Sequence, residues 1–145
     1  MSTTNPYRIL LADDHTILRQ SLKVMLKEQP HLEVIGEAGD GIELLHLLNS
    51  DTMVPQMVIL DISMPKLSGI EAARMIKTHR PEIKILILTM HKEKEYVSEA
   101  LSAGVEGYLL KEDAGTELFE AIESIRQGGT YLSSLLIKLA KDENS

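Results

Sequence analysis

Three short runs of apolar residues limit the folds open to this sequence more than any other feature. The runs are ILL (9–11), VIL (58–60) and ILIL (85–88), and none of them alternates with polar residues. Continuous runs of this length are typical of parallel strands that are covered by helices on both faces of a sheet. The sequence therefore indicates an α/β protein with a central parallel sheet.

The strands and helices are predicted to alternate along the chain. We place strands at residues 8–12, 33–38, 56–61, 83–89 and 106–110, and between them apolar side chains recur every three or four residues, as in helices that pack one face on a sheet. Ser68 with Glu71, and Asp40 with Glu43, have the spacing of a capping box at a helix start. Five βα units then account for residues 7–128, and we expect a doubly wound, flavodoxin-like sheet of five strands in the order 2-1-3-4-5.

The last part of the chain, residues 129–145, follows a Gly-Gly break. Leu132, Leu135, Leu136 and Leu139 lie at helical spacing and predict a short sixth helix. Its apolar stripe has three uses that the sequence alone does not separate: packing on the domain, pairing with a second copy, or leading into a further domain.

Composition excludes several classes of function. With 145 residues, 43% hydrophobic and 26% charged, the chain has the size and balance of one soluble globular domain. It has no apolar run of membrane-spanning length, and the start MSTTNPYR has no signal-peptide pattern, so we expect a cytoplasmic protein without a membrane partner. The absence of cysteine excludes disulfides and thiolate chemistry, and the net charge of −7 argues against DNA binding by these residues themselves.

Polar residues follow the predicted strands at the points where they end. Asp13 and Asp14 follow the first strand and Asp61 ends the third, while Thr89 ends the fourth and Lys111 follows the fifth. Ligands of open parallel sheets bind beyond the carboxyl ends of the strands, so we expect these side chains to meet at one edge.

A cation would resolve the repulsion of three neighbouring carboxylates. The five histidines show no ligand spacing such as HExxH and are interpreted as surface or core-edge residues, so the predicted ion is hard and oxygen-seeking, and Mg²⁺ suits it best. A carboxylate beside Mg²⁺ can attack phosphorus, and Asp61 is the best candidate. Lys111 would neutralise phosphoryl oxygens, and the Thr89 hydroxyl would hydrogen-bond one of them.

These residues resemble a known family. LADDH (11–15), Asp61 with MP three residues on and SG after it, LTMH (88–91) and GYLLK (107–111) are similar to the motifs of the receiver domain of bacterial two-component response regulators. The residues of these motifs are most similar to those of the NarL/FixJ (LuxR-type) subfamily. The resemblance covers about residues 7–128 and implies a CheY-like fold, with residues 1–128 as receiver and 129–145 as a helix and linker to a DNA-binding domain that this chain lacks.

The resemblance also implies the chemistry of the site. Asp61 would accept a phosphoryl group from a phosphohistidine of a sensor histidine kinase. Asp13, Asp14 and Asp61 would bind Mg²⁺ with the backbone carbonyl of Ser63. Such a protein is a switch and not an enzyme, apart from its own phosphorylation and slow dephosphorylation.

The switch residues follow from the same resemblance. Lys111 would pair with the phosphoryl group and Thr89 would move toward it. Tyr108 would turn inward and change the face formed by the fourth helix, fifth strand and fifth helix. Homodimerisation on phosphorylation is left open.

The sequence departs from the family pattern at two positions. Glu112 replaces the proline that often follows the lysine, so we expect a trans peptide there, and Met90 is bulky where many receivers have a small residue.

Two alternative functions accompany this interpretation: a stand-alone receiver or phosphorelay protein, and a Mg²⁺-dependent phosphohydrolase. Haloacid-dehalogenase-like enzymes have an acid/base aspartate two residues after the nucleophile, where this chain has Ser63, which disfavours the hydrolase.

Overall fold

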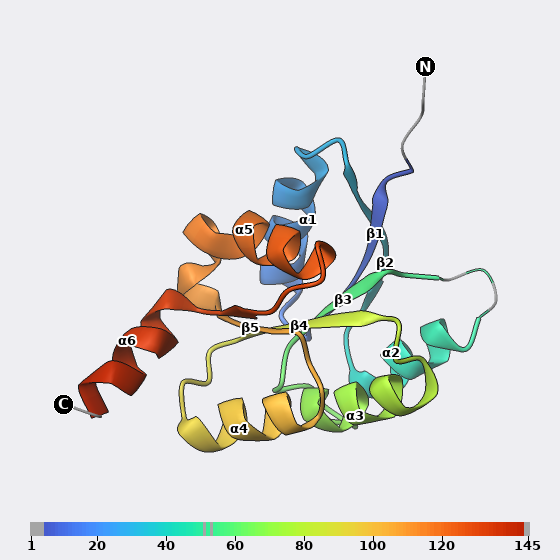
Figure 1. The fold of residues 1–145 in the computed structure, drawn as a ribbon. Coiled ribbons are helices and arrows are strands. Elements are labelled where there is room, and N and C mark those ends of the chain that lie inside the picture. The colour runs from blue at the N-terminus through green and yellow to red at the C-terminus, as the bar shows by residue number, and fades with distance from the viewer. Residues whose placement is uncertain (1–4, 51, 53, 144–145) are drawn as a thin grey trace.

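The structure, a computed structural model, describes residues 5–50, 52 and 54–143 and shows a sheet between two layers of helices (Figure 1). Residues 1–4 of the segment inspected for a signal peptide, and residues 144–145 at the end of the predicted linker, lie outside the described residues. No helix in the described ranges is long and apolar enough to cross a membrane.

The sheet has the predicted strand order. All pairings are parallel and run β2-β1-β3-β4-β5-β6, so the order 2-1-3-4-5 is confirmed and a sixth strand is added. The strands are β1 (Tyr7–Ala12), β2 (Leu32–Ala38), β3 (Met57–Leu60), β4 (Lys84–Thr89), β5 (Gly107–Leu110) and β6 (Tyr131–Leu132). The helices are α1 (Thr16–Lys27), α2 (Gly41–Leu48), α3 (Gly69–His79), α4 (Lys94–Ser102), the 3₁₀ helix η1 (Lys111–Asp113), α5 (Ala114–Arg126) and α6 (Ser134–Glu143).

Each face of the sheet forms its own core, which explains the continuous apolar runs. Alternate side chains point to opposite faces of a strand. Ile9 and Leu11 pack in one cluster with α1 and α5, whereas Leu10 and Ala12 pack in another with α2, α3 and α4. Figure 1 shows these two groups of helices on opposite sides of the sheet. A strand that is buried on both faces requires an apolar residue at every position.

Both predicted N-cap residues cap their helices. The Asp40 carboxylate accepts a hydrogen bond from the Glu43 backbone N–H at 2.8 Å and begins α2. The Ser68 hydroxyl accepts one from the Glu71 backbone N–H at 3.3 Å and begins α3. Each bond satisfies a backbone donor that the first turn of a helix leaves free.

The sixth strand corrects the prediction for the end of the chain. Tyr131 and Leu132 pair with Gly107 and Tyr108 of β5, so Leu132 belongs to a strand and not to the helical stripe. The predicted helix is confirmed but begins at Ser134. A strand of two residues is too short to produce a sequence pattern, because it depends on pairing with a neighbouring strand and not on its own side chains.

Candidate phosphoryl-acceptor site

Carboxylates gather where β1 and β3 end side by side. Ligand atoms of Asp13, Asp14, His15 and Asp61 all lie within 4.8 Å of one another. The backbone continues the sheet here, since the Asp61 N–H donates to the Ala12 carbonyl at 2.9 Å. Asp13 and Asp61 are 4% and 2% exposed, so two of the three acidic groups are withdrawn from solvent.

A lysine from another strand neutralises part of this charge. Lys111 follows β5, and its Nζ lies 3.1 Å from Asp13 Oδ2 and 3.1 Å from Asp61 Oδ2. Its side chain is 11% exposed, so the ion pairs are screened little by water. The structure thus brings together the carboxylates and the lysine that the sequence analysis assigned to one edge of the sheet.

A cavity of about 230 Å³ opens in front of Asp61. Thr89 is fully buried at the end of β4 and lines this cavity, and so does the largely exposed Met90. The other lining residues are His15, Ser63, His91 and Lys111. A carboxylate, a hydroxyl and an ammonium group therefore face one space, and positioned groups of these kinds suit phosphoryl transfer.

Tyr108 does not line the cavity but lies behind it. Its side chain is fully buried, and its hydroxyl donates to the His91 backbone carbonyl at 2.8 Å. Burial raises the pKa of the Tyr108 phenol far above its ordinary value, so the hydroxyl stays protonated and remains a donor. The hydrogen bond connects β5 to the loop after Thr89.

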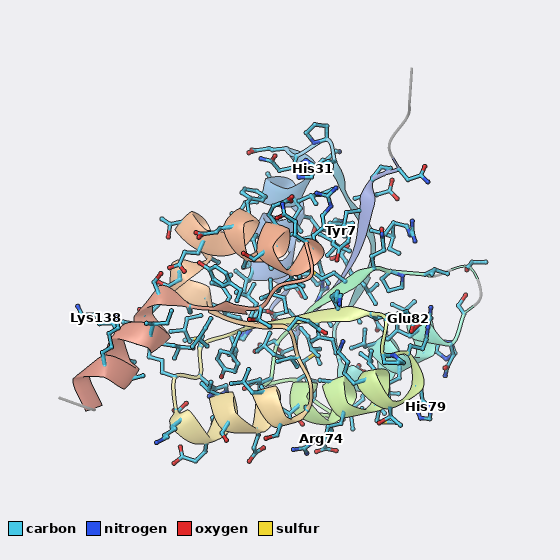
Figure 2. All side chains as sticks on the ribbon, in the orientation of Figure 1. Tyr7, His31, Arg74, His79, Glu82 and Lys138 are labelled. Atoms are coloured by element: carbon cyan, nitrogen blue, oxygen red, sulfur yellow. The ribbon has the colours of Figure 1, made fainter. Side chains whose placement is uncertain are left out.

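The structure places two histidines at the site, which the sequence analysis interpreted as surface or core-edge residues and did not assign to it. His15 lies among the carboxylates, and the His91 ring contacts the Ser63 hydroxyl and packs on Tyr96 of α4 with ring centroids 4.4 Å apart. Their signal was proximity in the sequence, because His15 follows Asp14 directly and His91 is two residues after Thr89. For the remaining histidines the surface interpretation is correct: all are exposed, and Figure 2 shows two of them at the periphery. They are His31, His46 and His79.

The peptide after Lys111 is trans, as expected for a lysine followed by glutamate, since the described chain contains no cis peptide bond. The 3₁₀ helix η1 begins at Lys111 and passes directly into α5. The backbone therefore turns immediately after β5 and places the lysine side chain back over the acidic cluster.

The donor set suits a hard divalent cation. Three carboxylates converge, and oxygen ligands of this kind are those that Mg²⁺ prefers. The Ser63 backbone N–H donates to Asp61 Oδ1 at 3.4 Å, which holds the loop close to the Asp61 carboxylate. The Ser63 carbonyl as a further ligand stays a prediction.

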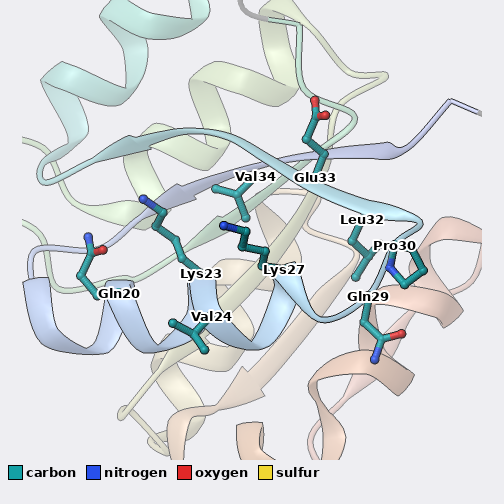
Figure 3. Close-up of a pocket in the computed structure, with 9 residues that line it drawn as sticks. All are labelled: Gln20, Lys23, Val24, Lys27, Gln29, Pro30, Leu32, Glu33 and Val34. Atoms are coloured by element: carbon teal, nitrogen blue, oxygen red, sulfur yellow. The ribbon is translucent and has the colours of Figure 1, made fainter.

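A larger cavity, of about 560 Å³, lies elsewhere. It opens between α1 and the edge strand β2 and is lined by apolar groups, two lysines and Glu33 (Figure 3). One of these lysines, Lys23, is paired with Glu37 at 2.7 Å. Burial opposes ionisation of Glu37, but bonds from Lys23 and Arg19 outweigh it and hold the pKa of Glu37 below its ordinary value. This cavity lacks the group of convergent carboxylates found beside Asp61.

The fold and the site together define a receiver: a doubly wound parallel sheet with an acidic cluster and a lysine at the carboxyl ends of its strands. Residues 9–123 match the response regulator receiver domain family. The chain belongs to this family, as the resemblance in its motifs implied.

Its relatives include transcriptional regulators and two-component proteins of known structure. The transcriptional regulatory protein MctR of Rhizobium johnstonii is 39% identical over 88% of this chain and 58% of the relative. A LuxR-family two-component response regulator from Aurantimonas sp. SI85-9A1 has a TM-score of 0.88 and is 33% identical, over 97% of this chain and all of that one. The receiver domain of RcsB from Salmonella enterica, solved with phosphomimetic BeF₃⁻, has a TM-score of 0.85 and is 30% identical, over 93% of this chain and 99% of that one. The chain spans little more than half the length of MctR.

Proposed function

We propose that this chain is a phosphorylation-activated switch in which Asp61 accepts a phosphoryl group from a sensor histidine kinase. A carboxylate oxygen of Asp61 attacks phosphorus, an O–P bond forms, and the P–N bond of the phosphohistidine breaks, so the kinase imidazole leaves with the bonding electron pair. The observation that carries the proposal is the Asp61 carboxylate itself. It is buried, ion-paired to Lys111 at 3.1 Å, and open on one side to a cavity of about 230 Å³.

Asp13, Asp14 and Asp61, with the Ser63 carbonyl, would hold Mg²⁺ at this site. The ion supplies positive charge to the phosphoryl oxygens when it is bound. Lys111 supplies a second positive charge, since its ammonium group already lies between Asp13 and Asp61. The fit of the donors to Mg²⁺ supports this assignment.

Thr89 and Tyr108 would pass the change of charge to the surface. Thr89 lines the cavity and would move to hydrogen-bond the phosphoryl group. The Thr89 hydroxyl accepts from the His91 backbone N–H at 3.4 Å, and the His91 carbonyl accepts from Tyr108. A shift of Thr89 would therefore move the loop that contacts Tyr108 and leads into α4. A change of charge at the site would in this way alter the structure at the surface.

The output is proposed to be transcription, controlled in the cytoplasm through a helix-turn-helix domain beyond this chain and through homodimerisation on phosphorylation. The name of MctR and its greater length support a further domain. A solved structure shows RcsB dimers bound to DNA, and the present chain covers 69% of the RcsB chain in that structure. A stand-alone phosphorelay protein is the alternative if the natural protein has no such domain.

Intact mass after incubation with acetyl phosphate and Mg²⁺ tests the proposal. The chain should gain one phosphoryl group, and neither Asp61→Asn nor the metal-free protein should gain it. Asp40→Asn is a matched control: it makes the same chemical change at a helix N-cap, where asparagine caps as well as aspartate. If the folded wild-type protein gains no mass, or if the Asp61→Asn variant still gains a phosphoryl group, the proposal is contradicted. Rapid turnover of acetyl phosphate would favour the phosphohydrolase.

A further inference from the structure

The imidazole of His15 lies inside the acidic cluster. Its Nδ1 is 3.1 Å from Asp13 Oδ1, 3.5 Å from Asp14 Oδ1 and 3.9 Å from Asp61 Oδ2. Ligands of an octahedral ion with bonds of about 2.1 Å lie roughly 3 to 4.2 Å apart. All three separations fall in this interval, so Nδ1 is placed as a fourth ligand atom would be.

The backbone presents the ring to the site. His15 precedes α1 as its N-cap residue, but its side chain makes no cap hydrogen bond. Its backbone N–H donates to Asp13 Oδ1 at 2.8 Å, which ties the start of α1 to the carboxylate. The ring is therefore held beside Asp13 without a structural task in the helix.

The Lys111 ammonium group lies beside the same nitrogen. Its Nζ is 3.1 Å from His15 Nδ1 and 3.1 Å from both Asp13 Oδ2 and Asp61 Oδ2. The space between the imidazole and the carboxylates therefore already accommodates a positive charge.

We infer that His15 is a nitrogen ligand of this site and makes it bind divalent transition-metal ions such as Co²⁺ and Ni²⁺ in preference to Mg²⁺. The inference rests on the proposed function, since it concerns the same cation site. Imidazole suits transition metals, whereas Mg²⁺ is bound by oxygen and keeps its waters. A site of carboxylates alone would lack this nitrogen-dependent preference.

Calorimetric titration of the untagged, metal-free chain with Ni²⁺, and separately with Mg²⁺, tests the inference. Loss of an outer-shell partner alone typically costs about tenfold in metal affinity, so His15→Ala should weaken Ni²⁺ binding at least about tenfold. Mg²⁺ binding should stay within about twofold. His31→Ala removes an exposed histidine away from the site and should change neither. Pulsed electron paramagnetic resonance of bound Mn²⁺ should show imidazole nitrogen in the wild type and lose it in His15→Ala.

Two results would overturn the inference: Ni²⁺ affinity equal in His15→Ala and wild type, or no nitrogen signal from bound Mn²⁺. Folding does not confuse the test, because the His15 side chain is 56% exposed. If phosphorylation at Asp61 still requires Mg²⁺ in those proteins, the proposed function stands and only the role of His15 fails. If acetyl phosphate never modifies Asp61 while His15→Ala loses Ni²⁺, the proposed function fails and the metal site stands.

Discussion

At the scale of single residues, Lys111 separates like charges. Its ammonium group lies 3.1 Å from each of Asp13 and Asp61, and all three side chains are at least largely buried. Removing one partner of a buried ion pair leaves the other charge without compensation, typically at a cost of about 3 kcal/mol. The lysine therefore stabilises the metal-free fold as well as serving the proposed chemistry.

Lys111→Met should lower the free energy of unfolding by about 3 kcal/mol in EDTA, because the two carboxylates then repel each other without a counter-charge. Mg²⁺ should recover much of this loss, since a ligand that binds only the folded state stabilises it. Urea unfolding with EDTA and with Mg²⁺ measures both effects.

Lys92→Met is the matched control for that change. Lys92 pairs with Glu112 at 2.8 Å, but the two side chains are 47% and 51% exposed, so the loss should stay below about 1 kcal/mol and be insensitive to Mg²⁺. Equal unfolding curves for the two variants in EDTA would show that Lys111 has no such role.

The residues of the site differ in how well the sequence predicts them. Asp13, Asp61 and Lys111 were predictable, because each follows a strand with a strong apolar pattern and parallel strands end at one edge. His15 was not, since ligand spacing rules describe residues on one helix or hairpin. Its place beside Asp61 follows from the predicted pairing of β1 with β3, but adjacency to Asp14 was its sole signal in the sequence.

At the scale of elements, α3 starts in direct contact with the phosphoryl-acceptor loop. Gly69 is the first residue of α3, and a Cβ there would lie 2.1 Å from the Asp61 carbonyl oxygen. The Gly69 N–H also donates to the Ile62 carbonyl at 2.9 Å. Because backbone atoms cannot move aside as a flexible side chain can, only glycine allows the helix to approach Asp61 this closely.

Gly69→Ala should therefore destabilise the fold by about 2 kcal/mol through overpacking and should reduce phosphorylation, because the clash displaces the backbone of Asp61. Urea unfolding and the acetyl phosphate mass assay measure these outcomes. Gly115→Ala is the control, since a Cβ at Gly115 in α5 meets no atom within 4 Å. It should be neutral or gain up to about 1 kcal/mol, and a Gly69→Ala protein that behaves the same way would refute the contact.

The sequence predicted the helices and strands that have a pattern of side chains, and it did not predict the strand that depends on pairing with a neighbouring strand. The five longer strands and the helix starts at Asp40 and Ser68 follow from apolar runs and capping residues. β6 does not, because its two residues are defined by backbone bonds to β5, such as the Ser133 N–H to the Tyr108 carbonyl at 2.9 Å. The residues of β6 themselves therefore show no pattern that would predict bonds to a strand elsewhere in the sequence.

At the scale of the whole molecule, the C-terminal segment of β6 and α6 is joined to the strand that precedes Lys111. Ser133 is fully buried, its hydroxyl accepts from the Leu110 N–H at 3.2 Å, and it donates to the Asp113 carboxylate of η1. Leu136 of α6 is buried in the core cluster on the α2, α3 and α4 face. The Ser133 hydroxyl thus adds a side-chain connection between the end of β5 and the C-terminal segment, beside the backbone bonds of β6.

Ser133→Ala should lower the free energy of unfolding by about 2 kcal/mol, because it leaves the buried Leu110 N–H without its Ser133 acceptor and removes one of the donors to Asp113. The loss should be local, so hydrogen exchange at Leu110 and in β6 should accelerate while exchange in β1 and β3 changes only with global stability. Ser134→Ala is the control: its hydroxyl donates to Glu117 at 3.0 Å but Ser134 is exposed, and its removal should leave β6 protected. If β6 exchanges equally fast in both variants, the backbone bonds to β5 and the packing of α6 hold the segment without the Ser133 hydroxyl, and Ser133 does not couple the candidate site to the C-terminal segment.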